Sequence, residues 1–107
     1  MSQRERTPEF AYMLVAEAIK SRIESGEWRP HRPLPAERRL AQELGYALGT
    51  VRHGTRILRD LGLLYTVPAK GTFVAPEAPA LLRRGVGADL LGGSFGAGRP
   101  LRAVGSE

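Results

Sequence analysis

The chain has 107 residues and a mass of 11.7 kDa, enough for one folded domain but not for two of ordinary size. Its 16 Lys and Arg against 11 Asp and Glu give a net charge of +5 and a pI near 10.4, above the value of about 9 that is typical of nucleic-acid-binding domains. The absence of cysteine excludes disulfides, thiolate nucleophiles and cysteine-based zinc sites, and no apolar run approaches the roughly 20 residues that cross a bilayer. We therefore expect a cytoplasmic domain held together by packing, with no metal, cofactor or membrane contact.

The first predicted helix lies between Thr7 and Gly26. Thr7, Pro8 and Glu9 have the residue types of an N-cap, a first helical position and a first-turn acid, and Gly26 supplies the stop. The apolar residues between them recur at helical spacing: Tyr12, Val15, Ala16, Ile19 and Ile23. Prolines exclude a helix over residues 28–33, so this segment is expected to be a connector on the domain surface.

Two further short helices are predicted around a tight turn. The first opens at residues 35–37 and ends at Gly45, and the second runs from about Gly49 to Gly62. The second of these helices has an apolar side and a side rich in arginine. Because a short helix, a glycine-containing turn and a basic helix follow one another, the pattern predicts a helix-turn-helix whose second helix contacts DNA.

A two-stranded hairpin is predicted after these helices. Residues 63–67 and 72–74 are rich in β-branched and aromatic residues, and they flank the turn-forming run Pro68-Ala69-Lys70-Gly71. Three helices followed by a hairpin is the order of a winged helix. The predicted fold class is therefore mainly α with a small β-hairpin, a winged helix-turn-helix with Lys70 near the tip of the wing.

Glycine and charge divide the chain. Residues 76–107 hold more than half of the 13 glycines, whereas residues 1–75 carry 12 Lys and Arg against 8 Asp and Glu, or +4 of the total charge of +5. We therefore expect an N-terminal arm (residues 1–8), a winged-helix domain (residues 9–75) and a Gly-rich C-terminal tail (residues 76–107). The tail is expected to be either disordered or a short dimerisation segment.

The second predicted helix and its surroundings resemble a family signature. The matching residues are Leu34-Pro35-Ala36-Glu37-Arg38-Arg39-Leu40-Ala41 and Leu44-Gly45, with Ser25-Gly26, Pro30, Thr50-Val51-Arg52, Leu58, Gly62-Leu63-Leu64 and Gly71-Thr72-Phe73-Val74 in register. Over about residues 10–75 this pattern is similar to that of the GntR family of bacterial transcription regulators. The resemblance implies a regulator, most often a repressor, that binds a double-stranded DNA operator as a homodimer.

The chain departs from the family pattern in three places. Four positions that usually carry a small hydroxyl residue, an arginine and two threonines are here Ala47, Leu48, Gly49 and Thr50. A base-reading arginine is thus replaced by Leu48, and Ala69 stands in the wing where glycine is usual. Residues 76–107 are too few for the family's C-terminal domain, so we expect no small-molecule effector domain.

The candidate DNA-binding residues lie on the second helix, the third helix and the wing. They are Arg38, Gly49, Thr50, Arg52, His53, Arg56, Lys70 and Gly71. Arg52 is expected to reach DNA, and its alternative is a solvent-exposed charge. Arg38 is expected to contact a phosphate, and its alternative is an ion pair with Glu37 or Glu43. Thr50 is expected to donate to a phosphate, to cap the third helix, or both.

Other functions stay open or are disfavoured. A protein-interaction module with no operator of its own is the alternative, because Leu48 and Gly49 give the third helix an apolar opening. An enzyme is disfavoured, and no catalytic residue is predicted, because the sequence has no cysteine, no paired-carboxylate spacing and no phosphate-cradling glycine loop. Trp28, Tyr65 and Phe73 are expected to pack on the core rather than to stack on single-stranded nucleic acid.

Overall fold

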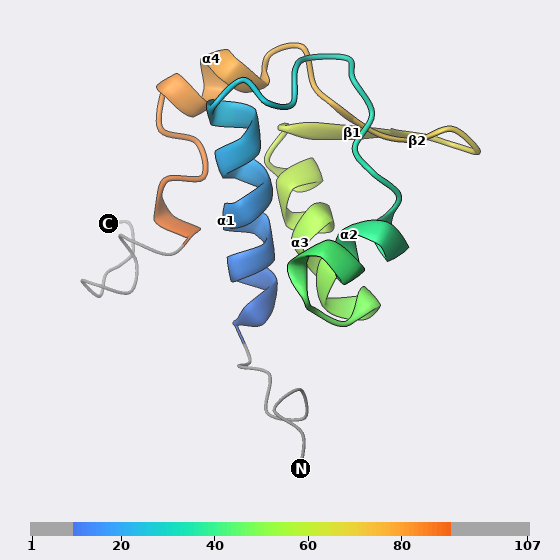
Figure 1. The fold of residues 1–107 in the computed structure, drawn as a ribbon. Coiled ribbons are helices and arrows are strands. Elements are labelled where there is room, and N and C mark those ends of the chain that lie inside the picture. Colours follow the sequence, from blue (N-terminus) through green and yellow to red (C-terminus); the bar gives the residue numbers. More distant parts are fainter. Residues whose placement is uncertain (1–9, 91–107) are drawn as a thin grey trace.

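The computed structural model describes residues 10–90, which form helices α1 to α4 and one antiparallel hairpin (Figure 1). In chain order the elements are α1 (Ala11–Glu24), α2 (Glu37–Leu44), α3 (Leu48–Asp60), β1 (Leu64–Val67), β2 (Gly71–Val74) and α4 (Ala78–Arg83). The predicted class, a mainly α winged helix-turn-helix with a small hairpin, is confirmed. The predicted helix start at Thr7 and the N-terminal arm lie outside the described residues.

The core lies where α1, α2, α3 and the hairpin meet, and α1 packs most extensively against α3 (Figure 1). Its largest fully buried side chains are Ile19, Leu40, Leu58, Leu63, Val15, Val51, Val74 and Thr55. α1, α2 and α3 therefore each contribute one apolar side, as their spacing of apolar residues predicts. Trp28 and Tyr65 pack against this core as expected, and Phe73 is partly buried and stacks on Tyr65.

Gly54 is the point of closest approach between α1 and α3. A Cβ atom added there would lie 2.8 Å from Cγ1 of Val15 and 2.9 Å from the carbonyl oxygen of Tyr12. Both distances are shorter than van der Waals contact, so only glycine lets the two helix backbones come this close. Glycine at position 54 therefore permits the close packing of α3 on α1.

The turn between α2 and α3 lies where the sequence predicts it, between Gly45 and the start of α3. α2 ends at Gly45, whose φ of 80° is left-handed, and Ala47 is extended at φ −66° and ψ 151° and forms the N-cap of α3. α3 therefore begins at Leu48, one residue before the predicted start at Gly49. The expectation that Thr50 caps this helix is wrong, since Ala47 holds the cap position and Thr50 is the third helical residue.

The connector between α1 and α2 runs along the outer edge of the hairpin. The amides of His31 and Leu34 donate to the carbonyl oxygens of Val74 and Thr72 at 2.7 and 2.8 Å, and the amide of Val74 donates back to Arg32 at 3.0 Å. The connector thus covers the free edge of β2. As a result, the start of α2 lies beside the hairpin.

The first part of the segment expected as a Gly-rich tail packs on the winged helix, as far as Leu90. α4 packs on α1, and Ala78 and Leu90 are buried. Gly85 and Gly87 take left-handed φ values of 95° and 82°, so glycines that suggested a loose tail instead make tight turns. Residues 91–107 of the expected tail lie outside the described part of the chain.

Lys20 fastens this C-terminal segment to α1. Its side chain is buried, donates to the carbonyl oxygen of Gly87 at 3.0 Å and pairs with Oε1 of Glu17 at 3.1 Å. A buried ammonium is tolerated only with such partners. The stem of Lys20 also lies against Gly87, so the contact is made by both packing and hydrogen bonding.

Candidate nucleic-acid interface

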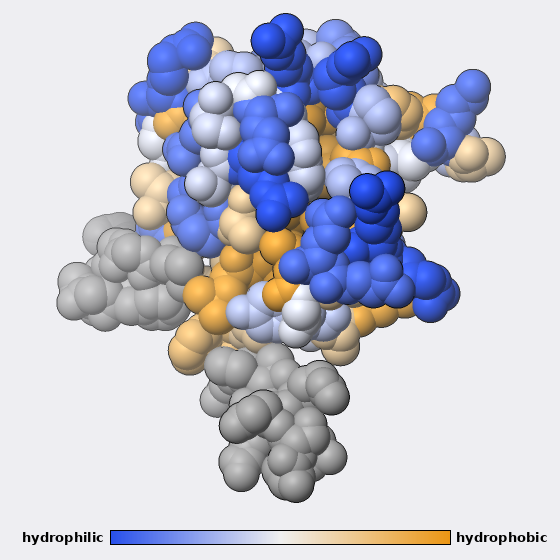
Figure 2. All heavy atoms as spheres, viewed as in Figure 1, coloured by the Kyte–Doolittle hydropathy of each residue, from blue (hydrophilic) through white to orange (hydrophobic). Residues whose placement is uncertain are grey.

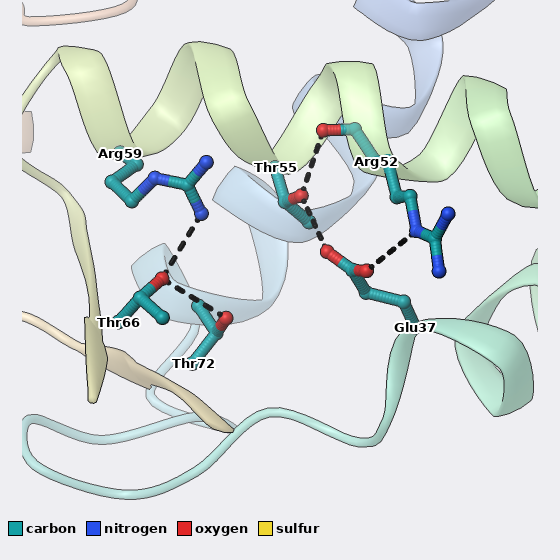
Figure 3. Close-up of polar contacts among 6 residues, drawn as sticks. All are labelled: Glu37, Arg52, Thr55, Arg59, Thr66 and Thr72. Atoms are coloured by element: carbon teal, nitrogen blue, oxygen red, sulfur yellow. Dashed lines mark hydrogen bonds and ion pairs between the residues drawn. The ribbon is translucent and has the colours of Figure 1, made fainter. Parts of the chain in front are cut away.

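Three arginines form a stripe along one side of α3. Arg52, Arg56 and Arg59 are spaced by four and three residues, which places them on neighbouring turns of the same helix side. Arg52 and Arg56 are exposed and Arg59 is partly buried. Figure 3 shows Arg52 and Arg59 reaching from α3 toward the side where α2 and the hairpin lie. We call these three residues the basic stripe.

Glu37 fixes the position of Arg52. Glu37 is the first residue of α2, and its Oε1 accepts a hydrogen bond from Nε of Arg52 at 3.2 Å (Figure 3). Oε2 lies 3.1 Å from Oγ1 of the buried Thr55, which also lies 3.0 Å from the carbonyl oxygen of Arg52. The single hydroxyl proton of Thr55 is therefore shared between two acceptors. The carboxylate joins α2 to α3 and engages only the Nε of the guanidinium.

This pairing leaves the two terminal nitrogens of Arg52 open to a ligand. Because 61% of the arginine side chain is exposed, the ion pair itself contributes only about 0–1 kcal/mol to stability. The ion pair instead orients the guanidinium of Arg52, since a guanidinium held at Nε keeps its two terminal nitrogens as a planar pair of free donors. Arg52 is thus an exposed charge that Glu37 holds at one nitrogen.

Arg38 is exposed and makes no hydrogen bond or ion pair within residues 10–90. The expected alternative, pairing with Glu37 or Glu43, is not formed. Glu37 pairs with Arg52, and Oε2 of Glu43 lies 3.2 Å from Nε of Arg39. The charge of Arg38 is therefore available on the outer side of α2.

His53, another candidate DNA-binding residue, lies outside the basic stripe and is partly buried. Its ring stacks on that of Tyr12 in α1, with centroids 3.9 Å apart and planes inclined by 12°. One residue beyond Arg52 is a rotation of about 100° around the helix, which directs this side chain toward α1 instead. His53 is thus a packing residue at the α1–α3 contact.

The N-terminus of α3 is open. Gly49 is exposed, a Cβ there would meet nothing within 4 Å, and no side chain caps the helix. The first amides of a helix have no acceptor within it, so those of Leu48, Gly49 and Thr50 point outward as donors. Leu48 is partly buried beside them.

The tip of the wing carries an exposed cation on a strained turn. Lys70 is exposed and has no partner within the described residues, and its amide donates to Val67 at 2.9 Å. Ala69 has φ 67° and Gly71 has φ 124°. Ala69, which stands where the family usually has glycine, therefore has left-handed backbone, which an alanine side chain disfavours.

Replacing Ala69 with glycine is expected to raise the free energy of unfolding by about 0.5–1 kcal/mol, because the relief of left-handed strain exceeds the entropy that glycine adds to the unfolded chain. Denaturant unfolding followed by circular dichroism measures it. The same exchange at Ala80, inside α4, should lower stability. Equal or lower stability for Ala69→Gly would show that the turn is not strained.

Comparison with known proteins decides the family. Residues 11–74 match the family model described as "Bacterial regulatory proteins, gntR family". This chain belongs to the GntR family. It is thus a domain of a DNA-binding transcription regulator and not an enzyme, and no helix within residues 10–90 is long and apolar enough to cross a bilayer.

The relatives of this GntR domain are longer proteins. It is 37% identical over 75 residues to the HTH-type transcriptional repressor NagR of Bacillus subtilis (strain 168), covering 70% of this chain and 31% of that protein. It is 42% identical over 64 residues to the histidine utilization repressor of Klebsiella aerogenes, covering 60% and 27%. The chain therefore spans about 30% of the length of these relatives.

A related domain has been solved on DNA. The crystal structure of the AraR DNA-binding domain in complex with operator ORX1 is 40% identical to this GntR domain, with a TM-score of 0.59, and the match covers 61% of this chain and 78% of that chain. Homologous domains of this kind thus bind operator DNA through the same fold.

Proposed function

We propose that this GntR domain binds a specific operator duplex, with α3 in the major groove and Arg52 as its base-reading residue. The observation that carries the proposal is the contact between Glu37 and Nε of Arg52, which leaves both terminal nitrogens without a partner among residues 10–90. An arginine that presents two parallel donors pairs with O6 and N7 of guanine. Arg52 thereby takes over reading that elsewhere in the family falls partly on the position of Leu48.

Cations on three elements are the proposed phosphate contacts. Arg38 on α2, Arg56 on α3 and Lys70 on the wing are all exposed and unpaired among residues 10–90. Figure 2 shows hydrophilic side chains gathered over α2 and at the hairpin tip on the same side of the molecule. The open amides at Gly49 and Thr50 support a further phosphate contact, and the left-handed backbone of Gly71 lets DNA approach the wing closely.

Repression by occupancy of a promoter, as a homodimer on two half-sites, is the proposed mode of action. The relatives from Bacillus subtilis and Klebsiella aerogenes are both named repressors. A single module of this size makes few base contacts, so two copies on a two-fold site supply the specificity that one lacks.

Selection from a pool of random duplexes, followed by mobility shift, tests the proposal. We expect enrichment of a duplex with at least one guanine in each half-site, and about five phosphate contacts give a log–log salt slope of about −4 to −5. If the folded protein enriches no duplex and does not bind at physiological salt, base reading is excluded. A protein partner for the same face would then be the better explanation.

A further inference from the structure

A cleft lies between the hairpin, the start of α2 and the end of α3. Its volume is about 480 Å³, and Arg59, Thr66, Lys70 and Thr72 are among its lining residues. Figure 3 shows Arg59 reaching down from α3 to the two threonines of the hairpin. None of the candidate residues predicted from the sequence, apart from Lys70 and Gly71, lines this cleft.

Arg59 is held against the hairpin by hydroxyl groups. Its Nη1 donates to Oγ1 of Thr66 at 3.0 Å, and Oγ1 of Thr66 lies 3.4 Å from Oγ1 of Thr72. Thr66 and Thr72 face each other across the two strands, so both hydroxyls lie on the same side of the hairpin. The guanidinium is thus directed into the cleft, with Nε and Nη2 unpaired in the described part of the chain.

The cleft carries uncompensated positive charge. Within residues 10–90, Arg59 pairs with no carboxylate, whereas Arg52 pairs with Glu37. Glu37 also lines the cleft, but its two oxygens are engaged by Arg52 and Thr55. Lys70 faces the cleft from the wing and has no carboxylate partner either. An anion placed between Arg59 and Lys70 would complement both cations.

We propose that this cleft holds a backbone phosphate of the bound DNA, with Arg59 and Lys70 contacting it from α3 and from the wing. Arg59 lies on the same side of α3 as Arg52 and about 10 Å further along the helix axis, so a strand read at Arg52 continues toward the cleft. The hydroxyls hold the guanidinium in place before DNA arrives, which lowers the entropy lost on binding. This inference rests on the proposed DNA binding and adds Arg59 to its contacts.

The salt dependence of binding to duplex DNA tests the inference. Arg59→Gln should make the negative slope of log affinity against log salt less steep by about 0.9. It should also weaken binding about eight-fold at 0.1 M monovalent salt, equally for enriched and unrelated duplexes. Arg59→Lys should keep most of the slope, since a lysine also neutralises a phosphate. Arg83→Gln on α4 removes the same charge away from the hairpin and should leave the slope unchanged.

A second variant separates phosphate binding from bracing of the hairpin. Thr66→Val removes the hydroxyl that holds Arg59 but keeps its charge, so it should retain the wild-type slope. An unchanged slope for Arg59→Gln, or an equal loss for Thr66→Val or for Arg83→Gln, would overturn the inference. If the wild-type protein itself binds no duplex at low salt, the proposed function fails instead.

Discussion

Replacing Gly54 with alanine is expected to lower the free energy of unfolding by about 1–2 kcal/mol, the cost of overpacking less the helix propensity that alanine adds. The new methyl group would overlap the side chain of Val15 and the backbone of Tyr12, at 2.8 and 2.9 Å. Backbone cannot swing aside, so α1 and α3 must separate, and overpacking of this kind costs about 1–3 kcal/mol. Denaturant unfolding monitored by circular dichroism gives the difference directly.

Gly49 provides the matched control in the same helix. Alanine at that position meets nothing within 4 Å. Since alanine is the better helix former, Gly49→Ala should leave stability unchanged or raise it by up to about 1 kcal/mol. If Gly54→Ala is as stable as Gly49→Ala, the close approach of α1 and α3 does not exist in solution.

Replacing Arg52 with alanine is expected to weaken binding to the enriched duplex by about 1–3 kcal/mol, the value of a bidentate arginine–guanine pair. The melting temperature should change little, because the exposed pair with Glu37 contributes about 0–1 kcal/mol. Fluorescence anisotropy on the enriched duplex measures the affinity, and Arg83→Ala controls for loss of one positive charge.

The affinities of the Arg52→Ala variant for duplexes of different sequence distinguish a base contact from a phosphate contact. Loss of Arg52 should flatten the preference at one base pair while affinity for unrelated duplexes falls only slightly. A uniform loss on every duplex would make Arg52 a phosphate contact. If the Arg52→Ala variant keeps the wild-type preference at every base pair, Arg52 does not contact a base.

Much of the fold could be predicted from the sequence because its signals are local. Gly45 and Gly62 end their helices with left-handed backbone at the predicted positions. Pro68 and Lys70 lie in the predicted turn between two short strands. In each case neighbouring residues determine the backbone, so no knowledge of distant packing is needed.

The remaining features depend on residues far apart in the chain. The need for glycine at position 54 arises only when α3 meets Val15. His53 looks exposed on a helix drawn alone but stacks on Tyr12 once α1 is in place. Gly87 suggested disorder by composition, yet a buried hydrogen bond from Lys20 holds it.

The candidate site shows the same division. Arg38 and Lys70 are exposed and unpaired among the described residues, as surface positions on their predicted elements imply. The role of Glu37 in holding Arg52 joins residues 15 positions apart, and the contact of Arg59 with Thr66 joins helix to wing. The pairing of Thr66 with Thr72 likewise follows from the register of the folded hairpin, whose second strand begins at Gly71 and not at residue 72.

Base reading by α3 is tested most directly with the wild-type protein on the enriched duplex and on its single-base-pair variants at physiological salt. Replacing the guanine read by Arg52 should lower the affinity roughly five-fold or more, which corresponds to at least 1 kcal/mol. Changes to base pairs outside the half-sites should alter the affinity little. Equal affinity for every variant would contradict sequence-specific recognition by this face.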